Sequence, residues 1–143
     1  MTSEELRNRT LRFAVRVVQF CRTLPDTWEA RRIGGQLIDA GTSVAMNYRG
    51  ATRGRSRAEF IAKLGIVVEE ADESLGWLEL IGQAGLARGT EFSWLLGEAE
   101  ELTAIFGKAQ KTAKDNTRWA VAVNEQINRT SPNRKSSISE VTP

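Results

Sequence analysis

The sequence predicts an all-α protein, folded as an antiparallel up-down-up-down four-helix bundle. Four segments carry apolar residues at alternating spacings of three and four positions, which is the pattern of an amphipathic helix. No segment has the alternating apolar pattern and tight turn of a β-hairpin. The connections between the segments are short, and short connections force neighbouring helices to run antiparallel. A chain of 143 residues is long enough for one such core and too short for two.

The first helix is expected at about residues 4–24, and the second follows it and continues until Gly50 and Gly54 loosen the backbone. Pro25 ends the first helix, because proline lacks the backbone N–H that a helix interior requires, and either Asp26 or Thr27 can cap the second. The apolar stripe of the first helix is Leu6, Thr10, Phe13, Val17, Phe20 and Leu24, and that of the second is Ile33, Leu37, Ala40, Val44, Tyr48 and Ala51.

The third helix is the most regular of the four. It starts at a capping box, in which Ser56 is followed three residues later by Glu59, and Gly82 and Gly85 end it. Thr90 can cap the fourth helix. The seam of the third helix is Phe60, Leu64, Val67, Ala71, Ser74, Leu78 and Ile81, and that of the fourth is Phe92, Leu95, Ala99, Leu102, Phe106 and Ala109.

Polar residues also recur along the second helix, at Gln36, Ser43 and Asn47. Buried polar side chains of this kind hydrogen-bond across a bundle and fix its register, which is the interpretation we give them. Cys21 lies beside the first stripe and is read as a small core residue.

The domain organisation is predicted to be a bundle over residues 1–114 and a polar, flexible C-terminal tail over residues 115–143. The tail is rich in Ser, Thr, Asn and Pro. Trp119, Val121 and Val123 are apolar residues within it. Two alternatives stay open for this strip: the last helix runs on into it, or it docks on a neighbour.

Composition excludes several classes of function. The chain has no histidine, which removes imidazole-based triads and His-containing metal sites, and its single cysteine can form no intrachain disulfide. No catalytic residue, metal, cofactor or small-molecule substrate is therefore predicted, and we expect no enzyme. No apolar run is long enough to span a bilayer and no secretory signal is visible, so the expected location is the cytoplasm.

Charge is segregated along the chain. Residues 1–66 hold twelve Lys and Arg against six Asp and Glu, residues 67–101 hold one against nine, and residues 102–143 hold seven against three. This division predicts a basic face and an acidic face, which favours a polyanion partner, a head-to-tail contact between copies, or both. The acidic stretch of the third helix is interpreted as a solvated face; it comprises Glu69, Glu70, Asp72, Glu73 and Glu79.

A basic cluster marks the junction between the second and third helices. It consists of Arg49, Arg53, Arg55, Arg57 and Lys63. Guanidinium groups beside the positive end of a helix dipole favour a phosphate, so these residues are predicted to contact nucleic acid. The alternative is that they are solvated or pair with Glu59, Glu69 and other acids within an oligomer.

Four large apolar residues lie beside the seams rather than on them. They are Ile66, Trp77, Trp94 and Ile105. Exposed apolar flanks of this kind are typical of protein contacts, which makes these residues candidates for an oligomer interface. The alternative is that each only widens the core.

The central half of the chain resembles the bacterial four helix bundle protein family, also called 23S rRNA intervening-sequence or S23-like proteins. The resemblance rests on Gln36-Leu37, Ala40-Gly41-Thr42-Ser43-Val44-Ala45, Asn47-Tyr48-Arg49, Arg53-Gly54-Arg55-Ser56-Arg57-Ala58-Glu59-Phe60, Lys63-Leu64 and Glu70-Ala71-Asp72-Glu73-Ser74.

The resemblance implies a short bundle that assembles into a ring, typically a homopentamer, in the bacterial cytoplasm. Some members are encoded within insertions of the large-subunit ribosomal RNA gene, and a distantly similar group serves diversity-generating reverse transcriptases as accessory subunits that bind nucleic acid. No catalytic residues are carried over. The leading hypothesis is an oligomer that associates with RNA or DNA through the basic cluster, and the alternative is a protein-interaction scaffold that binds no nucleic acid.

Overall fold

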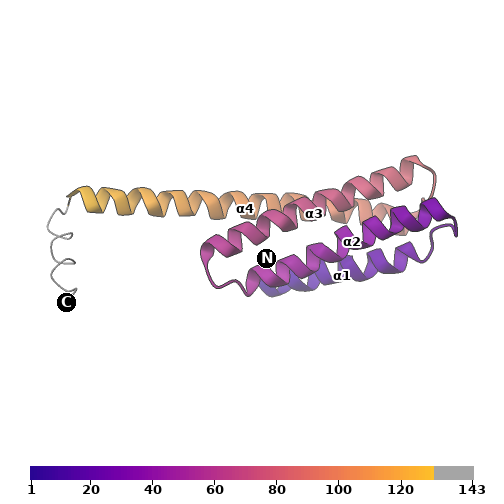
Figure 1. Cartoon of the computed structure of the whole chain (residues 1–143), viewed down its shortest axis with the longest axis horizontal. Coiled ribbons are helices and arrows are strands. Elements are labelled where there is room, and N and C mark those ends of the chain that lie inside the picture. Colours follow the sequence, from indigo (N-terminus) through magenta and orange to yellow (C-terminus); the bar gives the residue numbers. More distant parts are fainter. Residues whose placement is uncertain (131–143) are drawn as a thin grey trace. The chain divides into compact units, whose positions relative to one another are not determined.

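The computed structural model describes residues 1–130, apart from the side chains of residues 118–120 and 130. Every regular element in this range is a helix, as the sequence predicts (Figure 1). The helices are α1 (Ser3–Cys21), α2 (Trp28–Thr52), α3 (Arg57–Gln83) and α4 (Thr90–Thr130). Residues 1–110 form one compact unit, called the bundle below, and residues 111–130 belong to a second unit.

Side-chain caps set where α2 and α3 begin. Thr27, one of the two candidates, caps α2, and Ser56 caps α3 by accepting a hydrogen bond from the backbone N–H of Glu59 at 3.1 Å. The carboxylate of Glu59 accepts from the backbone N–H of Arg55 at 3.1 Å, which closes the turn before the helix. The predicted start of the third helix is therefore confirmed, but the predicted capping box is only half formed, because Glu59 accepts from Arg55 and not from Ser56.

Two predicted boundaries are wrong by a few positions. The first helix ends at Cys21 and not at Leu24, since the chain turns there through a hydrogen bond from the N–H of Thr23 to the carbonyl of Phe20. Thr90 is the first residue of α4 and not its cap. The carbonyl of Gly89 instead accepts the first helical hydrogen bond, and its φ of +110° is one that glycine adopts readily.

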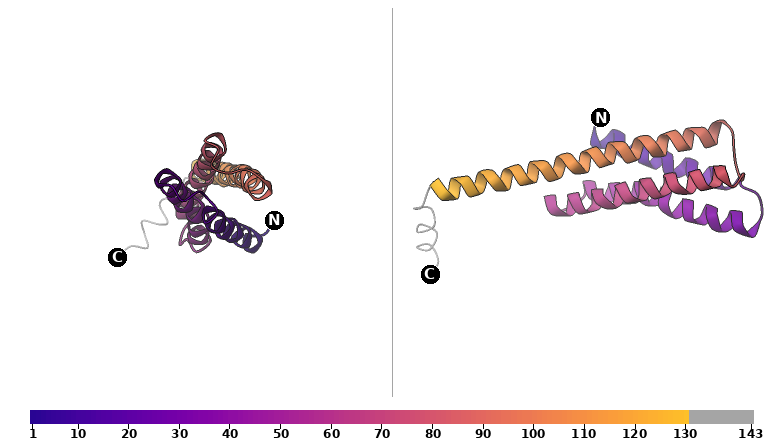
Figure 2. Two further views of the ribbon diagram at one scale, coloured as in Figure 1. Left: turned by 90° about the vertical axis from the view of Figure 1, so that its right-hand side faces the viewer. Right: turned by 90° about the horizontal axis from the view of Figure 1, so that it is seen from above.

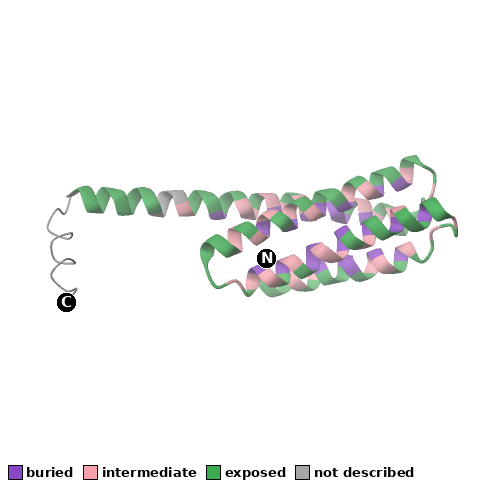
Figure 3. Ribbon diagram, in the orientation of Figure 1, coloured by how far each residue is buried: buried purple, intermediate pink, exposed green. Residues whose placement is uncertain are grey.

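The core of the bundle follows the predicted stripes, and Figure 3 shows the buried residues along the helix sides that face one another. Its largest fully buried side chains are Phe13, Val17, Leu37, Val44, Leu64, Val67, Leu78, Ile81, Leu95, Leu102 and Phe106. The stripe residues that are only partly buried pack against this cluster, and they are Leu6, Leu24, Ile33, Phe60, Phe92 and Ala109. The buried hydroxyls of Thr10 and Ser74 donate to carbonyls of their own helices, so both are satisfied.

Contacts between the helices establish the antiparallel order. Between α1 and α4, Arg9 pairs with Glu98 and Arg16 with Glu91, so the residue numbers rise on one helix as they fall on the other. The α1–α2 and α3–α4 connections lie at one end of the bundle and the α2–α3 connection at the other, as Figures 1 and 2 show. Helices α1 and α2 approach closely where a Cβ on Gly41 would meet the side chain of Val17 at 3.1 Å.

The polar residues of α2 do not bond across the bundle, contrary to the prediction. The amide of Asn47 donates to the carbonyl of Ser43 in its own helix at 2.9 Å, and Gln36 is exposed. A side chain one turn from a helical carbonyl finds that acceptor without any partner helix, which explains the difference.

Helix α4 runs on to Thr130, which is the first of the two alternatives for the predicted tail. No glycine or proline interrupts residues 108–131, so nothing in this stretch breaks a helix. Residues 131–143 of the predicted tail, and the side chain of Trp119, lie outside the described residues. None of the described helices is apolar over a length that would cross a membrane.

Candidate nucleic-acid interface

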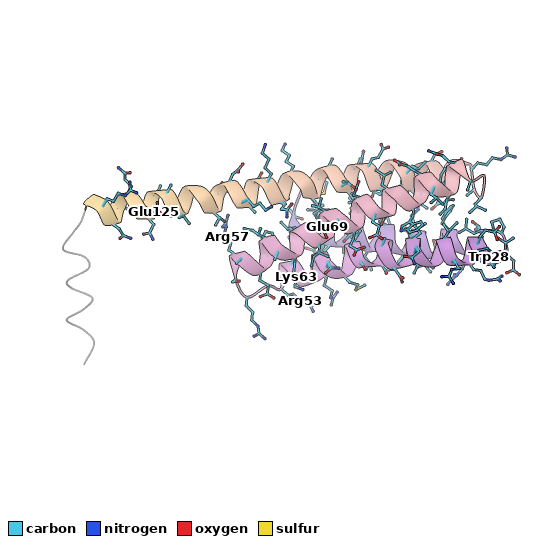
Figure 4. All side chains as sticks on the ribbon, turned by 45° about the horizontal axis from the view of Figure 1, so that its top comes forward. Trp28, Arg53, Arg57, Lys63, Glu69 and Glu125 are labelled. Carbon is cyan, nitrogen blue, oxygen red and sulfur yellow. The ribbon has the colours of Figure 1, made fainter. Side chains whose placement is uncertain are left out.

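The structure gathers the predicted basic cluster at the end of the bundle where α2 passes into α3. Arg49 lies in the last turn of α2, Arg53 at its C-cap, Arg55 in the connection and Arg57 at the first position of α3. All four side chains are exposed, and Lys63 in the second turn of α3 is half-buried. Figure 4 shows Arg53 and Lys63 near this junction and Trp28 at the opposite end of the bundle.

Lys63 crosses from α3 onto α2. A Cβ on Gly50 would lie 3.3 Å from Cδ of Lys63 and 3.4 Å from its Nζ, so the stem of the lysine covers the last turns of α2. The C-terminal carbonyls of a helix carry partial negative charge, which stabilises the nearby cations Lys63 and Arg49. Lys63 and Arg49 therefore stabilise the end of α2 and also contribute to the positive charge of the basic cluster.

Most of the cluster has no carboxylate partner in the described part of the chain. Among the ion pairs of the described residues, Arg9 pairs with Glu98 and Glu101, Arg16 with Glu91, and Arg31 with Asp26. Within the same range, Arg49, Arg53, Arg55 and Lys63 have no carboxylate oxygen within 4.0 Å. An anion can therefore approach these four groups without first displacing a paired carboxylate.

The start of α3 adds less to anion binding than the sequence suggests. Ser56 accepts from the N–H of Glu59 in the first turn of α3. The Glu59 carboxylate accepts from the N–H of Arg55 in the connection and occupies the positive end of the helix dipole. The exposed guanidinium groups, rather than backbone N–H groups, are what the junction offers to a phosphate.

The acidic stretch of α3 stays apart from the cluster. Glu69, Asp72, Glu73 and Glu79 are exposed, and no cation pairs with them within residues 1–130. Partial burial raises the pKa of Glu70, and the neighbouring carboxylates of Glu73, Glu69 and Asp39 raise it further. No group of three or more Cys, Asp or Glu side chains in the described chain is placed to hold a metal ion.

Comparison with known proteins places these features in a family. A family model described as 23S rRNA-intervening sequence protein matches residues 4–108. The chain belongs to this family. A crystal structure of a protein with unknown function from the S23 ribosomal protein family of Bacteroides thetaiotaomicron is also similar, with a TM-score of 0.71 and 29% sequence identity. The similarity covers 78% of this chain and 99% of that chain. A search of curated proteins gave no match.

The 23S rRNA-intervening sequence protein match spans both the basic cluster and the four predicted interface residues. Of these, Trp77 and Trp94 are half-buried and pack against the core, which is the alternative of a widened core. The Arg16 guanidinium carbon lies 3.4 Å from the ring centroid of Trp94. The Trp94 ring therefore makes a cation–π contact with α1 of the same chain. Ile66 remains 39% exposed, and Ile105 is half-buried outside the core cluster.

Helices α1 and α2 also expose apolar residues that are not among the predicted interface residues. Leu11, Val15, Trp28 and Met46 are exposed by 48%, 47%, 69% and 55%. Leu11 and Val15 stand one helical turn apart and off the main stripe of α1, and that second, shorter stripe was the available signal.

Proposed function

We propose that this member of the 23S rRNA-intervening sequence protein family is a non-enzymatic protein that binds structured RNA through phosphate contacts of its basic cluster. The carrying observation is that Arg49, Arg53, Arg55 and Lys63 gather at one bundle end without a carboxylate partner in residues 1–130. The family description names ribosomal RNA, which supports RNA as the ligand.

The cluster suits the phosphate backbone rather than the bases. Exposed guanidinium groups on a turn between helices reach phosphates from many directions, and phosphate contacts carry no sequence information. Each phosphate contact releases counterions and adds roughly 0.7 to 0.9 to the slope of log affinity against log salt. Four contacts therefore predict an affinity loss of roughly a hundredfold between 50 and 200 mM salt.

Filter binding of large-subunit ribosomal RNA fragments over a salt series tests this proposal. The variant Arg49→Ala/Arg53→Ala/Arg55→Ala should bind weakly and should lower the salt slope by about two to three. The control Arg12→Ala/Arg32→Ala/Lys108→Ala removes the same charge from other exposed sites. Equal affinity and equal slope in the two triple variants would refute phosphate binding at the junction.

We also propose that the chain works as a ring-shaped homo-oligomer in the cytoplasm, a homopentamer in the form that the family resemblance implies. The segregated charges and the exposed apolar residues of α1 and α2 support contact between copies.

The same features favour the second candidate function, a protein-interaction scaffold without nucleic-acid binding. A scaffold predicts negligible RNA affinity at physiological salt, and the filter-binding series separates the two candidates.

A further inference from the structure

The exposed apolar residues of α1 and α2 line one groove. Leu11, Val15 and Met46 border a groove of about 290 Å³ between the outer sides of the two helices. Its other lining residues are Ala14, Val18, Gln19, Arg22 and Thr42, and the whole set is called the α1–α2 groove below. Along α1 the exposed or half-buried positions Leu11, Val15, Val18 and Arg22 follow spacings of four, three and four, so they form one straight stripe.

The charged side chain of this groove is basic. Arg22 belongs to the lining, and it has no carboxylate partner in the described chain. An occupant of the α1–α2 groove therefore needs apolar side chains together with carboxylates.

Helix α3 carries a surface of this chemistry on its own outer side. Ile66 and Leu80 are 39% and 42% exposed, and the stripe between them is spaced by three and four. This stripe, the α3 face, is Ile66, Glu69, Glu73, Gly76 and Leu80, and all five residues are exposed. A Cβ on Gly76 would meet nothing within 4 Å, so another helix can approach closely there. The stripe spans about 21 Å of helix against about 17 Å for the α1 stripe.

We infer that the α1–α2 groove of one copy receives the α3 face of a second copy. Carboxylates of the α3 face then meet Arg22, and the apolar residues of both surfaces leave water together. Two α3 faces would repel each other, because Glu69 and Glu73 would oppose their own copies, so the contact joins unlike surfaces.

The arrangement of the bundle lets one copy use both surfaces at once. Helix α2 packs against both α1 and α3, and the α1–α2 groove and the α3 face share no residue. A contact between unlike surfaces repeats from copy to copy and closes into a ring where the rotation allows. This inference rests on the homo-oligomer part of the proposed function and is independent of RNA binding.

Complementation between two interface variants tests the inference. The groove variant Leu11→Glu/Val15→Glu places carboxylates opposite the acidic α3 face, and the face variant Ile66→Lys/Leu80→Lys places cations opposite the basic groove. All four positions are exposed, and circular dichroism melting checks that both variants keep their fold. The control Val121→Glu/Val123→Glu introduces the same charges at exposed apolar residues of α4 outside both surfaces.

Native mass spectrometry should find the wild type and the control assembled, and each interface variant alone at the 15.9 kDa of one chain. A mixture of the two interface variants should give complexes that contain both, because each variant supplies the intact surface that the other lacks. The inference is overturned if the wild type is monomeric or if the control dissociates. It is also overturned if either interface variant assembles alone, or if the two variants do not associate in the mixture. Filter binding measures RNA affinity of the same variants in a separate experiment, so loss of assembly can be distinguished from loss of RNA binding.

Discussion

Replacing Arg9 should cost more stability than replacing any exposed arginine of the chain. Both oxygens of the Glu98 carboxylate accept from Arg9, with Nε at 3.2 and 3.0 Å and Nη2 at 2.5 Å, and Arg9 also pairs with Glu101. Glu98 is only 9% exposed, whereas Glu101 is 68% exposed. Arg9→Met keeps most of the stem and removes the charge, so the main effect is a nearly buried carboxylate without its partner.

The expected loss of unfolding free energy is about 2 to 3 kcal/mol, since a buried charged acceptor loses its donor. Arg31→Met is the matched control, because its partner Asp26 is 95% exposed, and its loss should stay below about 0.5 kcal/mol. In the double variant Arg9→Met/Glu98→Leu most of the stability should return, since no unpaired charge remains.

Urea denaturation at one fixed protein concentration, followed by tryptophan fluorescence, measures these differences. If Arg9→Met destabilises the chain no more than Arg31→Met does, the Arg9–Glu98 pair contributes no more than an exposed pair. If Arg9→Met/Glu98→Leu is less stable than Arg9→Met alone, an unpaired Glu98 carboxylate is not the cause of the loss.

Two further predictions concern titratable groups. The raised pKa of Glu70 means that the folded chain favours the protonated carboxyl, so this group's contribution to stability rises as the pH falls from neutral through that pKa. Glu70→Gln should therefore raise the unfolding free energy at pH 7 by about 0.5 kcal/mol and flatten its dependence on pH, and a less stable variant would contradict this. Burial raises the pKa of Cys21 to about 11, so iodoacetamide at pH 8 should alkylate the native thiol about a hundredfold more slowly than in urea, and equal rates would show an accessible thiolate.

Helix periodicity carried most of the fold prediction. Residues such as Leu64, Val67 and Leu78 are buried where the spacing of three and four places them, because one side of each helix must face the core. The ends of the helices were less predictable. Helix α1 ends at Cys21 because of a local turn. Helix α4 continues to Thr130 because residues 108–131 contain no helix breaker.

The candidate site was predictable in its location but not in its electrostatics. Arg9 and Arg53 are the same residue type, yet Arg9 pairs with a carboxylate 89 positions away and Arg53 has no such partner within residues 1–130. Pairs of this separation form only when the bundle assembles, so the sequence could not say which arginines stay available. The exposed Leu11 and Val15 were overlooked for a related reason, because attention to one core stripe per helix leaves a second stripe unexamined.

RNA binding by this chain requires that the basic cluster is available to RNA in the native protein. Native mass spectrometry of protein purified from bacteria without nuclease tests this directly, because it weighs subunits and bound RNA in one spectrum. RNA should accompany the wild type and the Arg12→Ala/Arg32→Ala/Lys108→Ala control, and it should be absent from Arg49→Ala/Arg53→Ala/Arg55→Ala. Wild-type protein free of RNA, or RNA retained equally by all three proteins, would contradict the account.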